Sequence, residues 1–128
     1  MARFAFRYVL SDGRDVHLRD ILQLLQPRGD PAAWELDHGE EGEFWATATP
    51  GHDVSWARAM AGTGQRLSGE TLRARTDDVL QVITGEFQAF EGSAASPWLM
   101  VRVFDSSVYE IETADEAVLA LARRHFGG

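Results

Sequence analysis

The sequence has no cysteine and no lysine. Without cysteine there can be no disulfide bond, no thiolate metal site and no cysteine nucleophile. All twelve basic residues are arginine, a bias that is typical of GC-rich coding sequence before it indicates any chemistry. No stretch approaches the length of about 18 uncharged apolar residues needed for a membrane span, so no membrane partner is expected. Arg7 interrupts the first apolar stretch, which argues against a signal peptide and favours a cytoplasmic location.

Positive charge is scarce. Twenty acidic residues against twelve basic ones give a formal net charge of −8. Such a surface repels phosphate backbones, so the charge disfavours nucleic-acid binding. It favours a basic protein partner, although a charge of this size also serves solubility alone.

The remaining composition is that of an ordinary folded protein. Hydrophobic residues make up 45% of the chain and aromatic residues 10%. The length suits one hydrophobic core, and no internal repeat, low-complexity tract or linker interrupts it. We expect a single domain over residues 1–128.

Hydrophobic spacing in the first half predicts a strand, a helix and a hairpin. Residues 3–10 alternate as in a half-buried strand. An apolar stripe over residues 18–25 indicates a helix capped by Asp15 and ended by Pro27. Extended segments at residues 33–37 and 43–49, joined by an acidic loop, are typical of a hairpin.

The second half is less uniform. Residues 52–67 are the least certain stretch: residues 52–61 fit either a short helix begun by Asp53 or a further strand, and residues 62–64 are expected to be a loop. Ser68 is a plausible N-cap for a helix whose apolar stripe extends to Ile83, with Gly85 just past its end. A strand is expected at residues 86–91.

The chain should close with a hairpin and a helix. Strands are expected at residues 98–104 and 107–112, with the turn between them at Asp105 and Ser106. Thr113 and Glu116 have the spacing of a capping box for the last helix, which Gly127 would end.

This order of elements predicts an α+β fold. Hairpins dominate, and strands do not alternate regularly with helices. We expect a single, largely antiparallel sheet of about five or six strands, with about three helices packed mainly on one face.

Catalytic and metal motifs are weak, and no catalytic residue or cofactor is assigned. His38, among acidic neighbours, and His52 are the weak candidates for a metal site; the alternative for His38 is a solvated hairpin tip. His52 and Ser55, like Asp105 and Ser106, have the residue types of a nucleophilic triad, but turn and cap roles explain them better. The glycine-rich residues 62–69 lack the lysine of a phosphate-binding loop, and the tripeptide at residues 28–30 is expected to be a turn.

The aromatic residues give the most specific hypothesis. If Phe44, Leu99, Val101 and Val103 face the core, alternation leaves other large side chains on the opposite face of the sheet. A loop or a second helix could cover that face and make it ordinary core. Left uncovered, it is a candidate interaction surface with acidic neighbours. The predicted surface comprises Trp34, Trp45, Trp56, Trp98, Met100, Phe104, Asp37, Glu40, Glu41 and Glu43.

The sequence therefore favours a small, acidic, non-enzymatic protein that binds another protein. The partner would be basic, as for a neutraliser of a cationic protein, or a second copy of the chain. The alternative is a small metal- or ligand-binding enzyme that uses His38 or His52 with neighbouring carboxylates.

Overall fold

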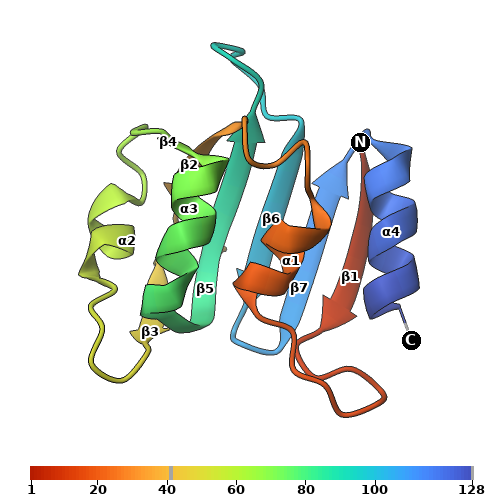
Figure 1. Cartoon of the computed structure of the whole chain (residues 1–128), viewed down its shortest axis with the longest axis horizontal. Helices are drawn as coiled ribbons and strands as arrows, with labels where there is room; N and C mark the ends of the chain where they lie inside the picture. Colours follow the sequence, from red (N-terminus) through yellow and green to blue (C-terminus); the bar gives the residue numbers. More distant parts are fainter. Residues whose placement is uncertain (41, 128) are drawn as a thin grey trace.

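The chain forms one seven-stranded antiparallel sheet with helices packed against it (Figure 1). The computed structural model describes residues 1–40 and 42–127. The strands are β1 (Ala2–Arg7), β2 (Ala33–Asp37), β3 (Trp45–Ala48), β4 (Leu67–Ser68), β5 (Val79–Phe90), β6 (Leu99–Phe104) and β7 (Val108–Thr113). The helices are α1 (Leu18–Leu24), α2 (Ser55–Met60), α3 (Gly69–Arg75) and α4 (Glu116–Phe126), with a short 3₁₀ turn, η1 (Thr76–Asp78), after α3.

The strand order is β1-β7-β6-β5-β2-β4, and β3 pairs with β5 outside this path. Every pairing is antiparallel. The long strand β5 is central, because it pairs with β6 along one edge and with both β2 and β3 along the other. The predicted α+β class and antiparallel sheet are confirmed.

One core joins the helices to one face of the sheet. The buried residues of α1, α2, α3 and α4 all belong to the same cluster as Leu36, Val101 and Ile111 of the sheet. Figure 1 shows α1, α3 and α4 in front of the strands. Burial of these apolar surfaces is the dominant stabilising term of the fold.

The predicted hairpin of residues 33–37 and 43–49 is wrong. β2 and β3 do not pair with each other; both lie along β5, with Asp37 opposite Glu86 and Trp45 opposite Thr84. The acidic loop between them is therefore an excursion from the sheet edge. Phe44 ends the excursion, and its ring lies so close to Gly85 that a Cβ there would be 2.6 Å from Cδ2 of Phe44.

The helix predicted from Ser68 to Ile83 is correct in its first half and wrong in its second half. Ser68 does cap α3, since its hydroxyl accepts a hydrogen bond from Thr71 N at 3.1 Å. The helix ends at Arg75, however, and β5 begins at Val79. Residues 79–83 therefore belong to the strand predicted to begin at residue 86, and β-branched side chains suit that state.

Two helices begin at other residues than predicted. α1 begins at Leu18 rather than at Asp15, and the carboxylate of Asp20 accepts the His17 N–H at 2.8 Å. α4 is capped by Asp115, whose Oδ1 accepts from Ala117 N at 3.1 Å and Val118 N at 3.3 Å. Thr113, the predicted cap, lies in β7. Of the two alternatives for residues 52–61, the helix is confirmed as α2, although its N-cap is Val54 and not Asp53.

Candidate functional site

The face of the sheet opposite the helices is uncovered within the described residues. Alternate residues of five strands project there, and each is exposed or half-buried. We call this surface the open face; it comprises Arg3, Ala5, Arg7, Glu35, Asp37, Glu86, Gln88, Met100, Arg102, Phe104, Val108, Glu110 and Glu112.

The pairing register aligns these side chains in rows across the strands. One row contains Asp37, Glu86, Arg102, Glu110 and Ala5, from β2 to β1. Neighbours in a row have Cβ atoms about 5 Å apart, so their side chains interact directly.

The next row toward the β5–β6 turn contains Glu35, Gln88, Met100, Glu112 and Arg3. Both rows therefore contain a carboxylate of β2 and a carboxylate of β7, and the first row adds Glu86 of β5.

Arg102 is the centre of a charge network on the open face. Its Nε donates to Glu86 at 3.1 Å, and its Nη1 donates to Glu110 at 2.8 Å and Glu112 at 2.7 Å. Arg3 reaches Glu112 from β1, with Nε 3.5 Å from Oε2. Three glutamates therefore share two guanidinium groups, and Asp37 adds a fourth carboxylate beside Glu86.

The carboxylates of this network are largely withdrawn from water. The side chains of Glu86, Glu110 and Glu112 are 16%, 18% and 12% exposed. Burial raises the pKa of Glu86, and the charge of Asp37 adds to the rise against the opposing charge of Arg102. The hydrogen bond from Arg102 lowers the pKa of Glu112. The two carboxylates of one network thus differ in how well their charge is compensated.

A shallow pocket of about 480 Å³ opens beside the network. His38 and Glu40 of the excursion between β2 and β3 form one side, and Phe104 and Arg102 of β6 form another. The pocket therefore combines an apolar wall with an excess of carboxylates, which is an environment that attracts a cation.

The predicted aromatic surface is only partly assembled. Met100 and Phe104 lie on the open face, and Trp45 is 54% exposed on the side opposite the buried Phe44, as alternation predicts. Trp34, by contrast, is fully buried in the core and donates Nε1–H to Gly29 O at 3.1 Å. It contributes to folding and not to a surface.

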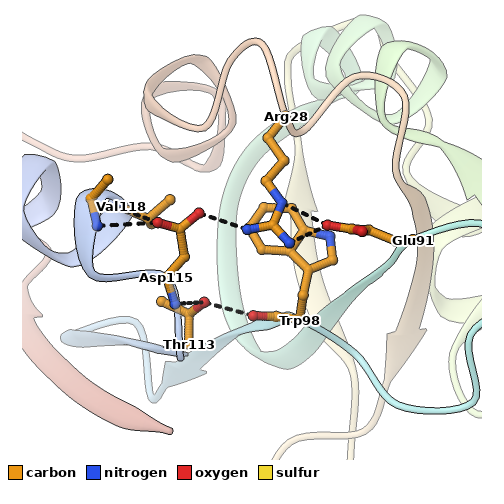
Figure 2. A network of polar contacts seen from close by, with 7 residues as sticks. Arg28, Glu91, Trp98, Thr113, Asp115 and Val118 are labelled. Atoms are coloured by element: carbon orange, nitrogen blue, oxygen red, sulfur yellow. Dashed lines mark hydrogen bonds and ion pairs between the residues drawn. The ribbon is translucent and has the colours of Figure 1, made fainter.

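Trp98 lies at the end of the sheet, beneath Arg28, instead of beside Met100 (Figure 2). The guanidinium carbon of Arg28 is 3.8 Å from the centre of the indole. Arg28 also bonds Glu91 and Asp115, at 2.6 Å for the latter, and so ties the segment after α1 to the end of β5 and to the cap of α4. The predicted turn at residues 28–30 is therefore a structural junction.

Trp56 and His52 share a partner that the sequence did not indicate. His52 Nδ1 lies 3.0 Å from Oδ1 of Asp78, and Trp56 Nε1 donates to Oδ2 of the same carboxylate at 3.0 Å. The neighbour Asp53 instead accepts a hydrogen bond from Ser55 N. No serine joins His52 and Asp78 among the hydrogen bonds of the described residues.

The remaining predicted residues are dispersed. Glu40 and Glu43 are exposed on the excursion, and Asp37 is half-buried on β2. Glu41 lies outside the described residues. The ring of His38 lies near the carboxylate of Asp37, with 3.8 Å between Nδ1 and Oδ1. Over residues 1–40 and 42–127, no group of three or more histidine or carboxylate side chains could hold a metal ion.

Sequence reasoning found Met100 and Phe104 but missed the charged network between them. Arg102 is the single charge in its apolar strand, and Glu110 and Glu112 alternate on the next strand. The available signal was the presence of charged residues at alternate positions of these strands. Alternate positions of a strand share one face of the sheet, so these charges could be expected on the same face.

Comparisons of this chain with protein-family models, with curated proteins and with solved structures gave no match. The longest helix in the described part of the chain has 11 residues, and none of the helices there could cross a bilayer.

Proposed function

We propose that this protein binds a basic protein partner through the open face, with a cationic side chain of the partner entering the pocket beside Arg102. The observation that carries the proposal is the charge imbalance there. Glu86, Glu110 and Glu112, with Asp37 next to them, outnumber the guanidinium groups of Arg102 and Arg3 on a face that no helix of the described residues covers.

Apolar side chains on the same face support this proposal. Met100 and Phe104 flank Arg102 along β6, and both are half-buried. An apolar contact around a desolvated charge is typical of the centre of a protein interface. The net charge of −8 would also accelerate the approach of a basic partner.

The proposal is tested with short arginine-rich, lysine-rich and glutamate-rich peptides of equal length. A cationic peptide should bind, and its affinity should fall as salt is added. The glutamate-rich peptide should not bind. Absence of binding by both cationic peptides overturns the proposal.

Matched variants separate the pocket from the general charge of the protein. Glu110→Gln should weaken cationic-peptide binding by about fivefold, since a partly desolvated ion pair contributes about 1 kcal/mol. Glu116→Gln removes the same charge from the exposed start of α4 and should change affinity by less than about twofold. Equal losses for the two variants would show general attraction and contradict a specific site.

A second copy of the chain is the other partner that suits an uncovered sheet face. Light scattering at two protein concentrations distinguishes it from a basic partner. If a second copy binds, the molar mass of the wild type should rise from that of a monomer to that of a dimer at the higher concentration. The molar mass of a Phe104→Glu variant should stay that of a monomer.

One observation favours the alternative of a small enzyme. The carboxylate of Asp78 orients His52 through Nδ1, and Trp56 fixes that carboxylate, so a half-exposed imidazole is held in one orientation. Carboxylate-oriented histidines act as general bases and metal ligands in enzymes. If His52 is a metal ligand, titration with divalent ions should raise the melting temperature, and His52→Ala should abolish that rise.

A further inference from the structure

A groove separates α1 from α4 on the helical side of the sheet, remote from the open face. Its volume is about 710 Å³, which lies within the range of about 300–1,000 Å³ typical of small-molecule sites. Residues 10–17, between β1 and α1, form one end, and the last turn of α4 forms the opposite wall.

The floor of the groove is apolar. Leu10, Val16 and Phe126 are buried there, at 8%, 2% and 7% exposure. Leu24 of α1 and Leu121 of α4 are half-buried and face the same space. An alkyl or aryl group placed between them would exchange water contacts for apolar ones.

The rim of the groove carries unbalanced negative charge. Asp15 and Asp20 line it, and within the described residues the carboxylate of Asp15 makes no hydrogen bond or ion pair. Arg14 is the one arginine among the described residues that line the groove, and it is already engaged, since Nε donates to Asp12 at 2.7 Å and Nη2 donates to the carbonyl of His125 at 3.4 Å.

The negative field extends to the neighbouring wall. Burial raises the pKa of Tyr8, and the charges of Asp15 and Asp20 raise it further. Tyr8 packs edge-on against His17, which lines the groove, with 5.7 Å between the ring centres. A cation in the groove would relieve this excess of negative charge, whereas an anion would increase it.

We propose that the groove between α1 and α4 binds a small organic ammonium ion, with its apolar tail on Leu24 and Leu121 and its charge beside Asp15. This site is independent of the open face, and its ligand is a free amine. The two imidazoles, His17 and His125, stand on opposite walls and can accept further hydrogen bonds from the ammonium group.

The probe is hexylammonium, compared at pH 8 with hexanoate and hexanol, which share its chain. Titration followed by amide NMR shifts should show hexylammonium binding most tightly, with shifts at Val16, Leu24 and Leu121. Butylammonium should bind about 15-fold more weakly than hexylammonium, because two fewer methylene groups are buried. The affinity should also fall with added salt.

The variant Asp15→Asn should weaken hexylammonium binding by about threefold to tenfold with little effect on folding, because within the described residues the exposed carboxylate of Asp15 makes no hydrogen bond or ion pair. The control Glu70→Gln removes the same charge from α3 and should leave the affinity unchanged. Hexanoate binding as tightly as hexylammonium, equal losses in both variants, or no binding up to about 10 mM would overturn the proposal.

Discussion

Arg102 donates a hydrogen bond to Glu86 at 3.1 Å, yet the pKa of Glu86 is raised. Burial of the Glu86 carboxylate between strands and the nearby charge of Asp37 outweigh the guanidinium. Arg102 compensates Glu112 better, since the pKa of that glutamate is lowered. One arginine cannot fully satisfy three carboxylates, and this imbalance is the physical basis of the proposed cation pocket.

The first prediction compares two neutral substitutions in this network. Glu112→Gln should destabilise the fold by about 1 kcal/mol, because it loses a favourable charge-assisted bond to Arg102. Glu86→Gln should cost less, or stabilise the fold, because it also removes an uncompensated charge. Urea denaturation of both variants at pH 7 measures the difference; a larger cost at Glu86 would contradict the account.

The pH dependence of Glu86→Gln follows from the raised pKa. The ionised carboxylate of Glu86 is less favourable in the folded state than in the unfolded state, so it lowers the free energy of unfolding in full above the raised folded pKa. This cost decreases as pH falls, and it disappears once the glutamate of the unfolded state is protonated too, near and below about pH 4. The stability of Glu86→Gln relative to wild type should therefore be higher at pH 7 than at pH 4. Unfolding curves at both pH values test this, with Glu116→Gln as the control that shows little change.

A second prediction concerns the junction around Arg28. Arg28→Ala should lower the free energy of unfolding by about 1–3 kcal/mol, because it removes the contact with Trp98 and the bonds to Glu91 and Asp115 together. Arg19→Ala is the matched control, since Arg19 makes an exposed ion pair with Asp77 that should contribute less than about 0.5 kcal/mol. Similar losses in the two variants would show that the junction is unimportant.

The same junction should affect acid stability. Burial alone would raise the pKa of Asp115, but the bonds from Arg28 and from the helix N–H groups lower it overall. Such a carboxylate stabilises the fold above its unfolded pKa, and that stabilisation is lost as pH falls through the lowered folded pKa. Arg28→Ala should therefore shift acid unfolding to higher pH, and an unchanged midpoint would refute the link.

A third prediction tests the close packing of Phe44 on β5. Gly85→Ala should destabilise the protein by about 1–3 kcal/mol, because the added methyl group meets the Phe44 ring. In a Phe44→Leu background the same substitution should cost less. A double-mutant cycle with an interaction energy near zero would contradict the contact.

The sheet class and the last hairpin could be predicted because turn residues and alternating side chains can be recognised within a short stretch of sequence. The turn residues Asp105 and Ser106 both adopt positive φ, and strands on either side alternate cleanly. Trp45 was placed correctly relative to Phe44 for the same reason. Alternation depends only on backbone geometry and not on the partner strand.

Pairing partners could not be predicted from such patterns. Residues 79–83 have apolar spacing compatible with a helix, and only pairing with β3 fixes them as part of β5. β2 and β3 could equally have paired with each other. The network around Arg102 depends on register across β5, β6 and β7, which no local window contains.

The central claim is that the open face accepts a cationic partner. Amide chemical-shift mapping during titration with an arginine-rich peptide tests it most directly. The account predicts salt-sensitive shifts concentrated in β6, β7 and residues 84–88 of β5, which need about fivefold more peptide to reach half of their full size in Glu110→Gln. Shifts concentrated on α1, α3 or α4, or shifts that persist unchanged in Glu110→Gln, would contradict it.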